Sequence, residues 1–187
     1  INQNESLKNL EIKPPYVVKP INEGSSVGVV IVKETKDVIN FSEDSDYGDD
    51  FMVEEYIPGR ELTVAVMGGL SLGVLEIKSS NQFYDYEAKY SKGRSTYIVP
   101  ATIPKETYDY CMEYASRAHK LLGCRGVTRS DFRWNETKGD TEGIYLLEVN
   151  TQPGMTSTSL VPQIAKYAGY TFGELVQWMV EDADCLR

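Results

Sequence analysis

Two short stretches of the sequence carry oxygen-bearing side chains at a spacing that suits a metal ion. Glu148 and Asn150 lie two residues apart at the end of an apolar segment, and Asp131 lies seventeen residues before Glu148. Hard cations such as Mg²⁺ prefer carboxylate and carbonyl oxygens, usually together with substrate phosphates. The pattern therefore predicts nucleotide chemistry supported by a divalent cation. The alternative, on these residues alone, is a solvated strand end that carries carboxylates by chance.

The elements around these residues are predicted to form a β-hairpin. Residues 127–134 and 143–150 have the pattern of strands, and Lys138-Gly139-Asp140 lies in the turn between them. Alternation gives one face of the first strand Arg129, Asp131 and Arg133. It gives one face of the second strand Ile144, Leu146, Glu148 and Asn150. If the inner faces of the two strands match, one side of the sheet collects Arg129, Asp131, Glu148 and Asn150.

The first half of the chain is predicted to be mostly β-structure, and the helices are expected in the second half. Further strands are predicted at 16–20, 27–32, 51–57, 61–67 and 72–78. Apolar residues at helical spacing predict helices over 104–122, near 159–168 and from Thr171. Thr171 and Glu174 have the spacing of a capping box. A weaker helix is expected at 34–41, and loops are expected at 42–50 and 80–95. The Tyr-rich loop 80–95 is of a length that is more often functional or mobile than idle.

Composition excludes several classes of protein. The net charge is −9, with 28 acidic and 19 basic residues, which argues against a nucleic-acid or anionic-membrane surface. No apolar run of about 20 residues is present, so no membrane span is predicted. Three scattered cysteines without a C-x-x-C pattern indicate neither a zinc site nor disulfides, and a reducing cytoplasm fits them. The single His119 is interpreted as a helix-surface or interface residue. The chain begins at Ile1, and we interpret it as a fragment of a longer polypeptide.

Two features of the first 30 residues suit phosphate binding. Lys19 follows an apolar strand and can reach phosphate oxygens as a compact cation. The turn Gly24-Ser25-Ser26-Val27-Gly28 can offer backbone N–H groups to phosphates, although G-x-x-x-G by itself usually indicates only a hairpin. Neither the P-loop motif nor G-x-G-x-x-G occurs, which disfavours P-loop and Rossmann folds.

An ordered set of motifs resembles the D-alanine–D-alanine ligase family of the ATP-grasp superfamily. The motifs are Val18-Lys19-Pro20, Glu23 to Gly28, Glu54 to Val64, Tyr84 to Tyr90, and Asp131 to Gly154. The resemblance extends from Tyr16 to the end of the chain. It implies an α+β, ATP-grasp fold with mostly antiparallel sheets and flanking helices. Residues 1–78 would then be the remainder of the central ATP-binding domain, and 79–187 the C-terminal domain with an ω-loop at 80–95.

The same resemblance implies roles for individual residues. Asp131, Glu148 and Asn150 would hold two Mg²⁺ ions, which Mn²⁺ could replace, with Glu148 bridging them. Glu54 and the backbone of Glu55 and Ile57 would hold adenine.

Further roles are implied for the rest of the site. Glu61 would bind the ribose. In the ω-loop, Tyr84 and Lys89 would contact the nucleotide, and Tyr90 would latch to Ser25 and Glu61. The remaining positions concern acyl transfer. Arg129 and the Gly154 N–H would stabilise the oxyanion of the tetrahedral intermediate. Ser159 and Leu160 would hold the carboxylate of a second D-alanine.

Each role has a plainer alternative. Glu54 and Glu55 could be exposed acids of a strand, Arg129 could form a surface ion pair, and Ser159 could be the N-cap of the next helix. The loop with Tyr84, Lys89 and Tyr90 could be an exposed surface.

The implied activity is ATP-dependent ligation of two D-alanines through an acyl phosphate, for peptidoglycan precursors in a bacterial cytoplasm. A homodimeric parent protein is expected, with no nucleic-acid or membrane partner. The alternatives are another ATP-grasp ligase such as a D-alanine–D-lactate enzyme, which Tyr90 disfavours, a non-catalytic nucleotide-binding module, or a structural or partner-binding domain. The family's N-terminal acid, His and second Lys have no counterpart here. The 187-residue chain alone is therefore predicted to be inactive.

Overall fold

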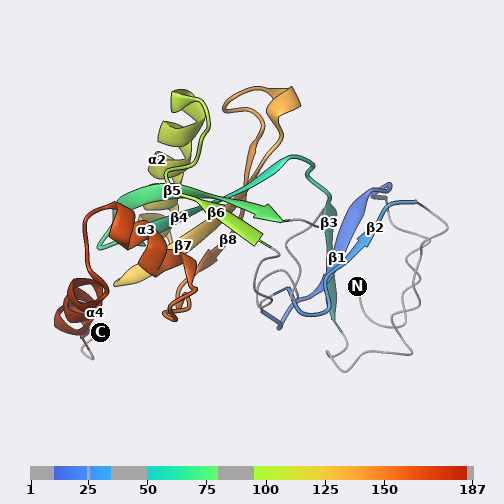
Figure 1. Ribbon diagram of the computed structural model, residues 1–187. Coiled ribbons are helices and arrows are strands. Elements are labelled where there is room, and N and C mark those ends of the chain that lie inside the picture. Colours follow the sequence, from blue (N-terminus) through green and yellow to red (C-terminus); the bar gives the residue numbers. More distant parts are fainter. Residues whose placement is uncertain (1–10, 25, 35–49, 80–94, 185–187) are drawn as a thin grey trace. The chain divides into compact units, whose positions relative to one another are not determined.

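Alternating apolar residues build two antiparallel sheets in the computed structural model (Figure 1). The structure describes residues 11–24, 26–34, 50–79 and 95–184. The helix expected at 34–41 and the loops expected at 42–50 and 80–95 lie almost wholly outside this range. The described chain forms two compact units, one with residues up to Ile57 and one with Pro58–Lys78 and Thr96 onward.

The first unit is a three-stranded sheet of order β2-β1-β3. Its strands are β1 (Tyr16–Pro20), β2 (Val30–Val32) and β3 (Phe51–Glu55). One face buries Tyr16, Val18, Val32 and Phe51 in a small core. The strand predicted at 16–20 is confirmed, whereas that at 27–32 begins only at Val30. The reason is a turn that includes Gly28, whose φ of 68° lies in the left-handed region open to glycine.

The second unit is a five-stranded sheet of order β6-β5-β4-β7-β8. Its strands are β4 (Arg60–Met67), β5 (Leu70–Ser79), β6 (Ser95–Ile98), β7 (Val127–Trp134) and β8 (Ile144–Asn150). Both β5 and β7 pair with β4 in antiparallel fashion, and β7 pairs with β8 as the predicted hairpin. The 3-10 turn η3 (Glu136–Lys138) lies between β7 and β8.

Pairing in this sheet explains where the compact units divide. Strands β4 and β5 hydrogen-bond to each other, and β4 continues the sheet to β7. Residues 58–78 therefore pack with the later part of the chain, whereas the sequence analysis grouped them with residues 1–57.

Helix α2 (Lys105–Leu121) covers one face of the five-stranded sheet, here called the α2 face (Figure 1). The core between this helix and the sheet contains Cys111 and Ala115 from α2 and, from the strands, Leu62, Val64, Val66, Val74, Phe132 and Trp134. Gly123 stops the helix just after its C-cap Leu122, as the sequence predicts. Gly123 has a φ of 65°, and the N–H groups of Gly123 and Cys124 donate to the carbonyls of Lys120 and His119.

Two short helices follow β8. Helix α3 (Leu160–Tyr167) packs against β4 on the side opposite to α2, and α4 (Phe172–Asp182) follows it (Figure 1). The capping box predicted at the start of α4 is confirmed, because Thr171 Oγ1 accepts from the Glu174 N–H and the Glu174 carboxylate accepts from the Thr171 N–H. No helix in the described ranges is long and apolar enough to cross a membrane.

Candidate functional site

The predicted meeting of four polar residues on one side of the sheet is confirmed. In the register of β7 and β8, Arg129 lies opposite Asn150, and Asp131 lies opposite Glu148. Directly opposed residues point to the same face of an antiparallel pair. These four residues define the Asp131 face, which is the side opposite to the α2 face.

One detail of the prediction is wrong. Strict alternation expected Ile144 and Leu146 to share a face with Glu148 and Asn150. In the structure Leu146 lies opposite Phe132 and Glu148 lies opposite Asp131, so Leu147 is an extra, bulged residue. Because Phe132 and Asp131 point to opposite faces, the bulge separates Leu146 from Glu148. It delivers the two polar residues of β8 to the Asp131 face.

Asp131 is the centre of the hydrogen-bond network on this face. Arg129 Nε donates to Oδ1 at 2.8 Å and Arg129 Nη2 donates to Oδ2 at 2.7 Å. Thr63 Oγ1 donates to Oδ1 at 2.6 Å, and Asn150 Nδ2 donates to Oδ2 at 3.0 Å. Each carboxylate oxygen thus accepts two hydrogen bonds. Asn150 Nδ2 also lies 3.2 Å from Glu148 Oε1, which links both carboxylates through one amide.

For two further residues of the Asp131 face, Thr63 and Arg133, the sequence analysis predicted no contact within the site. Thr63 is fully buried and lies directly opposite Asp131, yet no role was predicted for it. Arg133 was placed on the correct face, and its Nη1 lies 3.5 Å from Oε2 of Glu61. The alternation of Glu61 and Thr63 along β4 was the available signal, but it indicates the face only once β4 is known to pair with β7.

The donor set fits a divalent cation of the Mg²⁺ or Mn²⁺ type. Two carboxylates and the oxygen of an amide can supply oxygen ligands, which suit hard cations. The described residues contain no group of three or more His, Cys, Asp or Glu side chains arranged to hold a metal. With two protein carboxylates, such a site needs phosphate oxygens to complete its coordination, as Mg²⁺ sites in nucleotide enzymes commonly do.

A turn after β8 brings two other predicted residues together. A Cβ atom added to Gly154 would lie 2.9 Å from Ser159 Oγ, so these residues are in close contact. The Thr156 N–H donates to Ser159 Oγ at 2.9 Å. Ser159 is the N-cap residue of α3, as the alternative from sequence had it, but its hydroxyl accepts no hydrogen bond from an N–H group of that helix. Leu160 is the buried first residue of the helix.

In the first unit, the residues predicted for adenine and phosphate form an ion pair. Lys19 Nζ and Glu54 Oε1 are 2.7 Å apart, on the face of the three-stranded sheet opposite to its core. Glu55 is exposed at the end of β3, and Ile57 follows that strand. In the turn proposed for phosphates, the N–H groups of Val27 and Val29 already donate to the carbonyls of Gly24 and Ser26.

Four predicted residues lie outside the described part of the chain: Ser25, Tyr84, Lys89 and Tyr90. Their roles stay predictions from the resemblance.

Two reactive side-chain types outside the Asp131 face, the Cys111 thiol and the His119 imidazole, are buried and do not suit catalysis. Burial raises the pKa of the Cys111 thiol to about 12, which keeps it protonated near neutral pH. His119 is buried between α2 and β7 rather than on the helix surface, and its Nδ1 lies 2.9 Å from Thr128 Oγ1. Burial, and next the charge of Lys120, lower the pKa of His119 and favour its neutral form.

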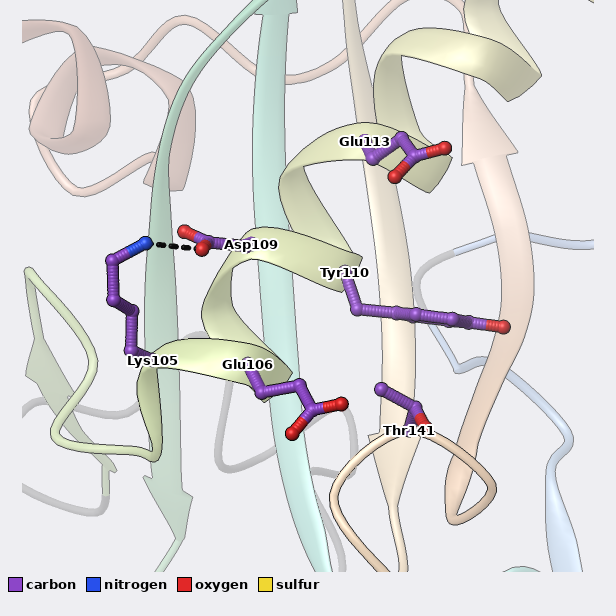
Figure 2. Close-up of a pocket in the computed structure, with 6 residues that line it drawn as sticks. All are labelled: Lys105, Glu106, Asp109, Tyr110, Glu113 and Thr141. Carbon is purple, nitrogen blue, oxygen red and sulfur yellow. Dashed lines mark hydrogen bonds and ion pairs between the residues drawn. The ribbon is translucent and has the colours of Figure 1, made fainter.

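A depression of about 470 Å³ lies between the start of α2 and the β7–β8 turn. Figure 2 shows the residues that line it. Its lining is mainly charged: Lys105, Glu106, Asp109, Tyr110, Glu113 and Thr141. Lys105 pairs with Asp109 along the helix, whereas Glu106 and Glu113 are exposed. None of the predicted site residues contributes to it, so we assign the candidate site to the Asp131 face.

Sequence comparisons identify relatives over nearly the whole chain. Residues 2–181 match the family model described as the D-Ala–D-Ala ligase C-terminus. A D-alanine–D-alanine ligase from Methylorubrum populi is 51% identical over the whole chain and 62% of its own length. One from Rhizobium meliloti is 56% identical over 94% of the chain and 58% of its own length. The chain therefore spans about three fifths of the curated relatives it matches.

Solved structures of ligases have the same fold. A Bacillus anthracis D-alanine–D-alanine ligase complexed with ATP matches 91% of this chain and 53% of its own, with a TM-score of 0.69 and 30% identity. A D-Ala:D-Ser ligase from Enterococcus faecalis matches 91% of this chain and 50% of its own, with a TM-score of 0.76 and 32% identity. The ATP-grasp fold expected from sequence is confirmed.

Proposed function

Since the chain belongs to the D-Ala–D-Ala ligase C-terminal family, we propose that it is the ATP-binding part of an enzyme that joins two D-alanines into D-alanyl-D-alanine. The observation that carries this proposal is the convergence of Asp131, Glu148 and Asn150 beside Arg129 on one face of the sheet. A face with oxygen ligands and a cation suits the transfer of a phosphoryl group.

The chemistry explains the need for ATP. The carboxylate of an amino acid is a poor electrophile until one of its oxygens carries a phosphoryl group. Transfer of the γ-phosphoryl group to one D-alanine gives an acyl phosphate and ADP. The amine of the second D-alanine then attacks the carbonyl carbon, the amine loses a proton, and phosphate leaves with the bonding electrons.

Asp131, Glu148 and Asn150 are the residues that would hold Mg²⁺ or Mn²⁺. When bound, such ions neutralise charge on the phosphates and on the transferred group. Oxygen ligands from two strands of one hairpin support this assignment, because the sheet fixes their separation.

The other residues would bind and orient the substrates. Lys19 and Glu54 form the pair that we assign to nucleotide phosphate and adenine, with the backbone of Glu55 and Ile57 beside the adenine edge. We assign Glu61 to the ribose hydroxyls. Tyr84, Lys89, Tyr90 and Ser25 keep their proposed roles in closing the site.

Acyl transfer needs stabilisation of a negatively charged oxygen. We assign this role to the Arg129 guanidinium and the Gly154 N–H, since fixed donors lower the energy of a developing oxyanion. The contact between Gly154 and Ser159 supports a shared site, in which Ser159 and Leu160 would bind the carboxylate of the second D-alanine. We propose that the reaction takes place in the cytoplasm and that the parent protein is a homodimer. We expect the 187-residue chain alone to be inactive.

ADP release tests this proposal. The chain is joined to the N-terminal part of its Rhizobium meliloti relative and assayed with Mg²⁺ and ATP. The amino-acid arms are no addition, D-alanine, L-alanine, and D-alanine with D-lactate or D-serine, because a D-Ala:D-Ser ligase is among the structural relatives. We expect turnover with D-alanine alone and its loss in Asp131→Asn. Turnover that does not depend on D-alanine would overturn the substrate assignment.

A further inference from the structure

The side chain of Thr63 contacts the proposed metal site although it supplies no ligand to it. Its hydroxyl lies 2.6 Å from Asp131 Oδ1 and 3.3 Å from the Ser130 carbonyl oxygen. A hydroxyl has one proton to donate, and the shorter distance assigns that proton to the carboxylate. Asp131 Oδ1 therefore receives a short, charge-assisted hydrogen bond from a neighbouring strand.

The position of Thr63 confines the donor of this hydrogen bond more closely than that of Arg129 is confined. Thr63 is fully buried in the middle of β4, between β5 and β7, and pairs directly with Asp131. A β-branched side chain in a strand has few accessible rotamers. Arg129 reaches the same carboxylate with a long side chain that is 17% exposed. Of these two donors to Oδ1, Thr63 is the shorter and the more completely buried side chain.

We propose that Thr63 is a positioning residue that fixes the orientation of the Asp131 carboxylate for a divalent cation. This inference rests on the proposed function. Groups that hydrogen-bond to a metal ligand orient it, and their loss typically lowers metal affinity about 10- to 100-fold. A purely structural role would predict altered stability without a selective change in metal binding.

The test measures Mn²⁺ binding by the 187-residue chain in the presence of a non-hydrolysable ATP analogue, from the electron paramagnetic resonance signal of free Mn²⁺. Thr63→Val removes the hydroxyl and keeps the branched shape. We expect it to weaken Mn²⁺ binding about 10- to 100-fold. Thr63→Ser keeps the hydroxyl and is expected to bind Mn²⁺ nearly as well as the unaltered chain.

Thr128→Val is the matched control. Thr128 is also a fully buried threonine of the same sheet with one side-chain hydrogen bond, but its partner is His119 on the α2 face. We expect this variant to retain Mn²⁺ affinity, and thermal unfolding of every variant establishes that the folded chain is being measured.

The outcomes separate the inference from the proposed function. Unchanged affinity in Thr63→Val, equal weakening in Thr128→Val, or failure of Thr63→Ser to restore binding would overturn the role of Thr63 alone, provided that Asp131→Asn weakens binding. If Asp131→Asn binds Mn²⁺ like the unaltered chain, or the unaltered chain binds none, the metal site and the inference both fall.

Discussion

The two faces of the five-stranded sheet each hold an arginine–carboxylate pair, and the surroundings of the pairs differ. On the α2 face, Arg60 Nε and Nη2 donate to the Glu76 carboxylate at 2.8 and 2.7 Å. On the Asp131 face, Arg129 binds Asp131 with the same two-pronged geometry at 2.8 and 2.7 Å. Geometry of the pair alone therefore does not distinguish a structural ion pair from a functional one.

The neighbours of each carboxylate make the distinction. Glu76 is 2% exposed, and its arginine also binds the Thr102 carbonyl and stacks over Trp134 at 5.1 Å. Burial would lower the pKa of Arg60, but hydrogen bonds and charges from Glu76 and then Glu136 raise it. Asp131, at 15% exposure, lies instead beside a second carboxylate and an amide. A carboxylate that solvent can reach and that lies beside further oxygen ligands is suited to bind a cation.

Substitutions of two consecutive residues of β7 are expected to differ most in their effects on stability and on Mn²⁺ binding. Phe132 lies in the core of the α2 face and is almost fully buried. Phe132→Ala is expected to lower the free energy of unfolding by about 3–5 kcal/mol, because it leaves a cavity. Asp131→Asn nearly keeps the volume of the side chain and leaves no cavity, so it is expected to lower the free energy of unfolding by less than Phe132→Ala does, and to abolish Mn²⁺ binding.

Urea unfolding and Mn²⁺ titration of both variants check this contrast. A large stability loss in Asp131→Asn with intact Mn²⁺ binding would reverse the assignment of the two faces.

Breaking the Arg60–Glu76 ion pair of the α2 face is expected to give the next largest loss of stability. Arg60→Met leaves the buried Glu76 carboxylate with only the exposed Lys78 ammonium, 3.9 Å away, and is expected to lower the free energy of unfolding by about 3 kcal/mol. The double variant Arg60→Met/Glu76→Leu removes both charges and should recover most of that loss. Urea unfolding of the single and double variants measures the coupling. Equal stability of the two variants would show that the loss is not caused by the Glu76 charge left without its arginine.

The fold followed from sequence wherever a local rule decides the outcome. Period-two runs identified β4 and β7, Gly123 marked the end of α2, and Thr171 with Glu174 marked the start of α4. Strand ends were less certain, as at Val30, because turn geometry rather than hydrophobicity sets them.

The candidate site was predicted less completely, for reasons that depend on pairing between strands. The bulge at Leu147 reverses the apparent face of Leu146 relative to Glu148, and nothing in the local pattern of β8 indicates it. The contact of Thr63 with Asp131 requires knowing that β4 and β7 are neighbours in the sheet. Motif resemblance predicts the metal ligands, because it carries their arrangement without deriving it, but it assigned no role to Thr63.

The smallest predicted effect is a change in how the free energy of unfolding depends on pH, and it comes from His119 on the α2 face. Because burial lowers the pKa of His119 in the folded chain, the unfolded chain binds more protons below its ordinary pKa of about 6.5. The stability contributed by neutral His119 is therefore complete above that pH and is lost as the pH falls through the lowered pKa. His119→Asn, which keeps a hydrogen-bonding group near Thr128, should flatten this decline in unfolding free energy between pH 7 and 5.

Mn²⁺ binding provides the comparison for that variant. His119 and Asp131 lie on opposite faces of the sheet, so the substitution should leave Mn²⁺ affinity at pH 7 unchanged while it alters the pH dependence of stability. An equal decline of stability with pH in both proteins would assign the acid sensitivity to other groups. A change in Mn²⁺ affinity would show that the two faces are coupled through β7, and the separation between a structural and a binding face would then fail.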